Sequence, residues 1–210
     1  IDQRTLTTSS SAGGSVTTPG EGAYQYDHGT DANIVATPEA NYHFVNWTGD
    51  TATITDVNAA TTTITMDGDY TIQANFAIDQ RTLTTSSTAG GSVTTPGEGA
   101  FQYDHDTNAN IVATPEANYH FVNWTGDTAT IADANSASTT ITMDGDYTIQ
   151  ANFAIDQRTL TTSSSAGGSV TTPGEGAFQY DHGTDANIVG TPDGGYHFVN
   201  WTGRGATAGK

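Results

Sequence analysis

Aspartates are the residues of this chain best suited to chemistry, because the same ones recur in two successive copies of one long sequence pattern. Carboxylate oxygens are the ligands that Ca²⁺ prefers in proteins. No EF-hand consensus surrounds them, so we predict that the protein has no cofactor, with calcium as the alternative. The candidate ligands are Asp50, Asp67, Asp69, Asp127, Asp144 and Asp146.

Two histidines in each copy raise a second metal hypothesis. His28 and His43 could act with Asp27 or Asp31, but the second copy has Asn108 in place of Asp31. No ligand spacing of the zinc type is present either. We therefore expect a plain polar role for the histidines.

No arrangement typical of catalysis accompanies these residues. Serine is abundant, yet no Gly-x-Ser-x-Gly elbow occurs, and Gly13-Gly14 lacks the Lys-Ser/Thr pair of a phosphate loop. Only small substitutions, such as Tyr24 to Phe101, separate the first two copies. An enzyme needs one asymmetric pocket, whereas near-identical copies multiply length or valency, so we predict that the protein is not an enzyme.

The repeated segment Tyr42-His-Phe-Val-Asn-Trp47 could present aromatic rings to a sugar. A small β domain needs a large buried aromatic side chain, so we predict that Trp47 lies in the core. The alternative is a repeated Tyr/Trp surface that binds glycans or another protein, with avidity from its multiple copies.

Two further kinds of site depend on covalent modification. Asn46, Asn123 and Asn200 each precede Trp-Thr and form glycosylation sequons, which matter only in a host that glycosylates. Lys210 is the only lysine, so lysine-to-asparagine isopeptide bonds cannot form inside the repeated units. Arg204 and Lys210 mark a candidate assembly end, where Lys210 could form only an intermolecular crosslink.

The composition narrows the classes of partner. The chain has 23 acidic and five basic residues and a formal charge of -18, which disfavours nucleic acid because its binding requires clustered Lys and Arg. Such acidity suits a soluble surface in salty water. There is no cysteine, and no apolar run approaches the roughly 18 residues of a membrane span.

The sequence IDQRTLTTSS begins at Ile1, Ile78 and Ile155 and divides the chain into units 1–77, 78–154 and 155–210. We call them units 1, 2 and 3. Unit 3 departs from the pattern at Arg204, so we predict two complete domains and a partial third whose missing last strands leave a sheet edge open. No Gly, Ser or Pro-rich linker separates Phe76 from Leu83, which predicts a stiff rod.

Short Thr-rich and β-branched runs between turn residues predict strands and an all-β fold. The clearest strand is 70–76, where Tyr70, Ile72, Ala74 and Phe76 share one face. Further strands are expected at 4–8, 15–18, 23–27, 32–37, 43–47 and 62–66. Only the stretch 56–60 has a pattern that would make one helical turn.

Two local features follow from residue spacing. Asp67-Gly68-Asp69 predicts a tight hairpin with Gly68 at positive φ. Phe44 and Trp47 cannot share a face in a regular strand, which predicts a bulge near Val45-Asn46. The predicted core of unit 1 comprises Leu6, Val16, Tyr24, Tyr26, Ile34, Val35, Tyr42, Phe44, Val45, Trp47, Ile54, Ile64, Met66, Tyr70, Ile72 and Phe76.

The pattern LTTSSSAGGSVTTPGEGAYQYDHGTDANIVATPEANYHFVNWTGD, ending in TITMDGDYTIQANF, resembles the divergent internalin B-repeat family of bacterial and archaeal surface proteins. Its most specific parts, 36–47 and 66–76, recur at 113–124 and 143–153. The resemblance spans each whole unit. It implies small β-rich modules, with a β-grasp-like α+β fold as the alternative to all-β, in secreted or cell-surface proteins without catalytic residues.

These observations favour a structural segment of an extracellular cell-surface protein, acting as a stalk or spacer or as the subunit of a self-assembling filament. The expected partners are copies of the chain or adjacent repeats of a longer one. The alternative is a multivalent adhesin module that binds a surface glycan or protein. The open edge of unit 3 could also accept a strand from a neighbouring molecule.

Overall fold

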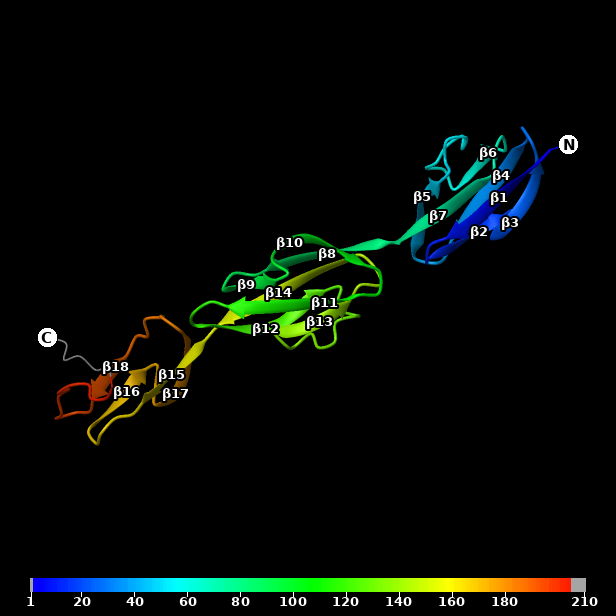
Figure 1. The fold of residues 1–210 in the computed structure, drawn as a ribbon. Helices are drawn as coiled ribbons and strands as arrows, with labels where there is room; N and C mark the ends of the chain where they lie inside the picture. Colours follow the sequence, from blue (N-terminus) through cyan, green and yellow to red (C-terminus); the bar gives the residue numbers. More distant parts are fainter. Residues whose placement is uncertain (1, 205–210) are drawn as a thin grey trace.

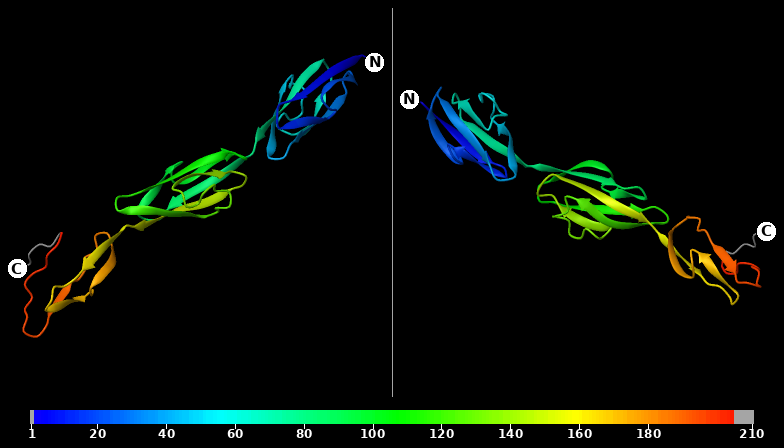
Figure 2. Two further views of the ribbon diagram at one scale, coloured as in Figure 1. Left: turned by 90° about the horizontal axis from the view of Figure 1, so that it is seen from below. Right: turned by 180° about the vertical axis from the view of Figure 1, so that it is seen from behind.

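The computed structural model describes residues 2–204, and its regular elements in that range are all strands. The three units follow one another along an elongated molecule (Figure 1, Figure 2). The all-β prediction is confirmed, and the α+β alternative is wrong for residues 2–204 because no helix forms there. It follows that this range also holds no helix of the length and apolarity that a membrane crossing requires.

Unit 1 contains β1 (Gln3–Ser10), β2 (Gly14–Thr18), β3 (Gly22–Asp27), β4 (Asp31–Pro38), β5 (Tyr42–Gly49), β6 (Thr61–Thr65) and β7 (Tyr70–Ile78). Unit 2 repeats them as β8 (Gln80–Ser87), β9 (Gly91–Thr95), β10 (Gly99–Asp104), β11 (Asn108–Pro115), β12 (Tyr119–Gly126), β13 (Ser138–Thr142) and β14 (Tyr147–Ile155). The strands described in unit 3 are β15 (Gln157–Thr162), β16 (Gly168–Thr172), β17 (Gly176–Asp181) and β18 (Val189–Pro192). All seven predicted strands of unit 1 form.

Two sheets make up each complete unit. In unit 1 their strand orders are β3-β1-β7-β5 and β2-β4-β6, and unit 2 repeats this arrangement. The last strand, β7, lies inside the larger sheet, where it pairs in parallel with β1 and antiparallel with β5. The described part of unit 3, residues 155–204, holds the two-stranded pairs β15-β17 and β16-β18 and no further sheet. The last strand of a complete unit therefore joins the two halves of its larger sheet.

Alternate residues of both sheets form one core in each complete unit. Leu6 of β1, Ile34 of β4 and Ile72 of β7 are almost fully buried, and each such burial contributes roughly 1.5–3 kcal/mol. Trp47 is only 2% exposed, and its indole N–H donates to the carbonyl of Ala59 at 3.0 Å. The prediction that this tryptophan belongs to the core is confirmed.

The predicted bulge is present in β5. The pairing of β5 with β7 shifts register between Phe44 and Asn46. As a result Phe44 and Trp47 both pack on the core, with ring centroids 5.6 Å apart. Val45 is 44% exposed. Its assignment to the core was therefore wrong, because Val45 directly follows the inward-facing Phe44 and so points to the opposite face of the strand.

Two predictions about turns are also wrong. β6 and β7 belong to different sheets, so Asp67-Gly68-Asp69 is a crossover between sheets and not a hairpin, and Gly68 does not have positive φ. The stretch 56–60 forms a turn in which the Asp56 carboxylate accepts a hydrogen bond from the Asn58 backbone N–H at 2.9 Å. A short polar side chain that captures a nearby N–H favours such a turn over a helix.

Candidate functional site

Two of the candidate calcium ligands in unit 1 hold the start of β7 in place. Asp50 Oδ2 accepts a hydrogen bond from the backbone N–H of Thr71 at 2.8 Å. Asp69 Oδ1 accepts one from the backbone N–H of Thr5, in β1, at 2.7 Å. Asp127 and Asp146 form the equivalent bonds in unit 2. These carboxylates thus fasten the last strand to both of its neighbours.

The third candidate ligand, Asp67, accepts a hydrogen bond from the hydroxyl of Tyr70, and Asp144 repeats this contact in unit 2. This bond raises the pKa of Tyr70, because loss of the phenol proton would leave two negative charges in contact. Residues 2–204 contain no group of three or more His, Cys, Asp or Glu side chains placed to hold a metal ion. Calcium binding by these aspartates stays a prediction.

The sequons at Asn46 and Asn123 lie on β5 and β12, the strands that contain the core tryptophans. The side-chain oxygen of Asn46 accepts a hydrogen bond from the side-chain amide of Asn75 at 3.0 Å, and the same amide donates to Thr48 at 2.9 Å. Asn123 has the equivalent partner in unit 2. Asn200 is exposed. Glycosylation of these sequons stays a prediction, and Asn200 is the most accessible acceptor of the three.

One aspartate connects units 1 and 2. Asp79 is the single residue between β7 and β8, and Figure 1 shows the chain passing directly from one strand into the next. Its N–H donates to the carbonyl of Asn41, in unit 1, at 2.8 Å. Its carbonyl accepts from the N–H of His105, in unit 2, at 2.8 Å. Its carboxylate also lies 2.9 Å from Nδ1 of His43, which gives that histidine a polar role.

Asp156 repeats this arrangement between units 2 and 3. Its N–H donates to the carbonyl of Asn118 at 2.7 Å, and its carbonyl accepts from the N–H of His182 at 2.8 Å. The carboxylate lies 3.0 Å from Nδ1 of His120. Sequence reasoning predicted short connections but missed this double attachment. The recurrence of Asp at the same place in each copy was the only available signal.

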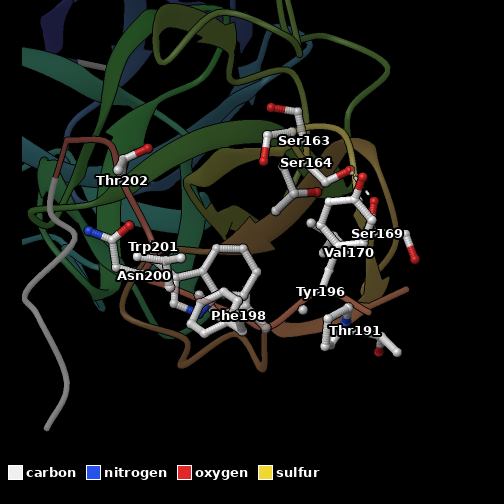
Figure 3. A pocket seen from close by; sticks show the side chains of 18 of the residues that line it. Ser163, Ser164, Ser169, Val170, Thr191, Tyr196, Phe198, Asn200, Trp201 and Thr202 are labelled. Atoms are coloured by element: carbon white, nitrogen blue, oxygen red, sulfur yellow. Dashed lines mark hydrogen bonds between the residues drawn. The ribbon is translucent and has the colours of Figure 1, made fainter. Parts of the chain in front are cut away.

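Unit 3 contains an open groove of about 1080 Å³. Leu160 and Val170 line it together with residues 196–204, which follow β18 without forming a strand. Figure 3 shows the rings of Phe198 and Trp201 lying against each other, and their centroids are 5.4 Å apart. In unit 1 the corresponding side chains Leu6, Phe44 and Trp47 pack against β7 and its neighbours, so the groove lies where a complete unit has its last strand.

The two residues of the candidate assembly end differ in what the structure describes. Arg204 is exposed and lines the rim of the groove, at the position that Asp50 and Asp127 occupy in the complete units. Lys210 lies outside the described residues. A crosslink through Lys210 stays a prediction.

The same family model matches the chain three times. It describes the divergent InlB B-repeat domain and covers residues 4–80, 81–157 and 158–210. Comparison with curated proteins and with solved structures gave no match. The three matches adjoin one another, and each begins in the first strand of a unit, at β1, β8 and β15. The chain therefore belongs to the divergent InlB B-repeat domain family.

Proposed function

We propose that this chain is a stiff spacer in an extracellular cell-surface protein, with no catalytic activity of its own. Membership of a structural repeat family supports this role. The near-identity of the units supports it as well, because copies that have not diverged extend a molecule without adding new chemistry. The partners of each unit are then the adjacent repeats.

The observation that carries the proposal is the attachment of Asp79, at the start of unit 2, to Asn41 and His43 of unit 1. A flexible linker leaves two domains free to reorient, whereas here one residue separates their strands. The hydrogen bond from its N–H to Asn41 of unit 1 contributes roughly 0.5–1.5 kcal/mol and is lost if the units bend apart. The bond that it accepts from His105 lies within unit 2 and repeats the bond from His28 to Asp2 in unit 1. The formal charge of -18 supports a solvated rod, because like charges along its length oppose folding back.

Small-angle X-ray scattering tests this proposal. Insertion of Gly-Ser-Gly-Ser-Gly after Asp79 should shorten the mean end-to-end distance of the chain and broaden its distribution. The matched control carries the same insertion after Gly29, a turn glycine inside unit 1 whose Cβ position has nothing within 4 Å, and should scatter like the parent. A parent chain that scatters like the Asp79 insertion variant would show that the units already move freely, and the spacer proposal would fail.

The adhesin alternative has less support. Trp47 and Trp124 are each 2% exposed, so the complete units offer no tryptophan for stacking on a sugar ring. The alternative prediction of an exposed Tyr/Trp surface is therefore wrong for Trp47 and Trp124, the tryptophans of units 1 and 2. A glycan or protein ligand of this chain would have to use other residues.

A further inference from the structure

We propose that units 1 and 2 bear tension along the chain, and that the parallel strand pair β1-β7, with its counterpart β8-β14, is the contact that resists it. This inference goes beyond the spacer role, because a spacer need not withstand force. It rests on the order and direction of the strands inside a complete unit, so it does not depend on the stiffness of the junctions.

A pulling force enters and leaves a complete unit through two neighbouring strands. β1 is the first strand of unit 1 and β7 is the last, and they lie side by side in the larger sheet. β7 passes into β8 through Asp79 alone, so unit 2 receives the force on its own first strand (Figure 1). β8 in turn pairs with β14, the last strand of unit 2. The two loaded strands are therefore direct neighbours in both units.

The direction of these strands decides how their hydrogen bonds are loaded. β1 and β7 run parallel, with Leu6 opposite Tyr70 and Ser10 opposite Ala74. The pull acts on the N-terminal end of β1 and on the C-terminal end of β7, which lie at opposite ends of a parallel pair. Tension therefore slides one strand along the other and loads the evenly spaced bonds between them together. In an antiparallel pair the two loaded ends would adjoin, and the bonds would open one at a time.

Side chains extend this strand pair at both of its ends. Before the paired region, Asp69 Oδ1 accepts a hydrogen bond from the Thr5 N–H at 2.7 Å. Beyond it, the Ser11 N–H donates to the carbonyl of Ala74 at 2.9 Å. The Ser11 hydroxyl accepts from the Phe76 N–H at 3.0 Å. Because each of these bonds joins β1 or the residue after it to β7 or the residue before it, sliding breaks them together with the bonds of the pair.

Unit 2 has the same contacts, although its sequence differs at one of them. Asp146 Oδ1 accepts from the Thr82 N–H at 2.8 Å. Thr88 stands where unit 1 has Ser11, and its hydroxyl accepts from the Phe153 N–H at 2.9 Å. Both residue types carry the hydroxyl that this contact needs. The strand pair is therefore extended in the same way in both complete units.

The core opposes the same sliding movement. Leu6 of β1 is fully buried and Ile72 of β7 is 1% exposed, and both belong to one core. A slip of β7 by one residue would turn its buried side chains toward the outer face of the sheet. The pair therefore has no favourable register one residue away, and we expect each unit to yield in a single step.

Single-molecule pulling on the full chain, held at its two ends, tests the proposal. Units 1 and 2 should each unfold in one abrupt step that lengthens the chain by less than about 280 Å, the extended length of 77 residues. The direction of the force provides the decisive comparison. The chain has no cysteine, so Gly68→Cys, directly before β7, creates a unique second point of attachment.

Force applied between the N-terminus and Gly68→Cys pulls β1 and β7 apart from one shared end. Unit 1 should then unfold at least about tenfold faster at the same force, because its bonds break one after another. The same variant held at its two ends is the control, and both of its steps should match those of the parent. A Cβ atom at position 68 would lie 3.2 Å from the hydroxyl end of the Tyr70 side chain, which can shift. Equal unfolding rates in the two directions would overturn the proposal.

A matched pair of variants tests whether the loaded contact is β1-β7. Ser11→Ala combined with Thr88→Ala removes the hydroxyl acceptor at the end of the strand pair in both units. This variant should unfold roughly twofold to tenfold faster when pulled end to end at a fixed force. Thr65→Val combined with Thr142→Val removes a hydroxyl that bonds β6 to β4, or β13 to β11, outside the path of the force. An equal acceleration by these control substitutions would overturn the assignment of the resistance to β1-β7.

Failure of this proposal is distinguishable from failure of the spacer proposal. Scattering reports on the junction at Asp79, whereas pulling reports on the strands inside a unit. Flexible junctions between units that resist end-to-end force would refute the spacer role alone. Stiff junctions between units that unfold equally fast in both directions would refute the tension-bearing role alone.

Discussion

Units 2 and 3 carry nearly the same sequence up to Gly126 and Gly203, yet only unit 2 folds all of that stretch into long strands. β8 and β11 each have eight residues, whereas their counterparts β15 and β18 have six and four. The shortened parts correspond to residues that pair with β13 and β14 in unit 2. Local sequence alone does not make these strands, because an edge left without its partner loses its regular pairing.

The same difference separates the two cores. Ile111 is fully buried in unit 2, and its counterpart Ile188 is 39% exposed. Trp124 is 2% exposed, whereas Trp201 is only partly buried. The side chains at these positions are the same in the two units, so they do not account for the difference in burial. The last two strands, which are present in unit 2, close its core. Substitutions at matched positions can therefore measure what that closure contributes.

The largest expected difference is between Trp124→Ala and Trp201→Ala. Removal of a buried tryptophan leaves a cavity and costs about 3–5 kcal/mol, which is most of the stability of a small domain. Trp201 packs on Phe198 in the open groove, so its removal should cost far less. Hydrogen exchange measured by mass spectrometry should show unit 2 losing most of its protection in the first variant, and unit 3 changing little in the second.

That measurement must distinguish units with nearly the same sequence. Peptides that include Asp106 and Asn108 identify unit 2, and peptides that include Gly190 and Asp193 identify unit 3. Equal losses of protection in the two variants would mean that Trp201 is packed as firmly as Trp124, and the comparison between a closed and an open core would not hold.

The sequence predicted the strands of a unit well because each strand depends on the alternation of its own side chains. Tyr70 to Phe76 alternates between apolar and polar residues, and β7 starts at Tyr70 as expected. The bulge in β5 was predictable for the same reason, since only an extra residue lets Phe44 and Trp47 reach one core. Both features are set within a few residues of sequence.

Sheet membership was not predictable in this way. The short turn 67–69 fits a hairpin as well as it fits a crossover, and the choice depends on β1, more than sixty residues earlier, which pairs with β7. The roles of the candidate site residues were hidden for the same reason. Asp50 and Asp69 look like metal ligands in the sequence, but they accept backbone hydrogen bonds from strands that only the fold brings near.

A smaller difference is expected between Gly126→Ala and Gly203→Ala. Gly126 has φ of 96°, and a Cβ atom there would lie 2.3 Å from the carbonyl oxygen of Thr148 in β14. The substitution should destabilise unit 2 by about 1–3 kcal/mol, because both the backbone strain and the clash must be relieved. Gly203 also has positive φ, but nothing lies within 4 Å of its Cβ position.

Denaturation in urea, followed by the same unit-specific exchange peptides, checks this second comparison. The Gly203→Ala chain serves as the matched control, because it carries the same change in the same sequence context without β14 beside it. If Gly203→Ala destabilised its unit as much as Gly126→Ala, the loss would come from backbone strain alone. Contact with the last strand would then contribute nothing at this position.

The smallest expected effect concerns acid. In unit 3 the Glu175 carboxylate accepts hydrogen bonds from the Ser164 hydroxyl and from the Val170 N–H, and these bonds lower the pKa of Glu175 below its ordinary value of 4.5. The unfolded chain therefore binds this proton at a higher pH than the folded chain does. These hydrogen bonds to the Glu175 carboxylate stabilise unit 3 above pH 4.5, and their contribution is lost as the pH falls through the lowered pKa.

Glu175→Gln should therefore reduce the protection of unit 3 slightly at neutral pH and remove part of its acid dependence below about pH 4.5. Glu98→Gln is the matched change in unit 2, where Glu98 joins Ser87 and Val93 in the same way. There β14 also pairs with the end of β8, so a second connection persists when the carboxylate is removed. Hydrogen exchange between pH 3 and 6 follows the two substitutions. If both units lost protection equally, the last strand of unit 2 would not help to hold the end of β8 in place. A larger effect in unit 3 would mean that an open unit depends on small surface contacts that a closed unit can lose.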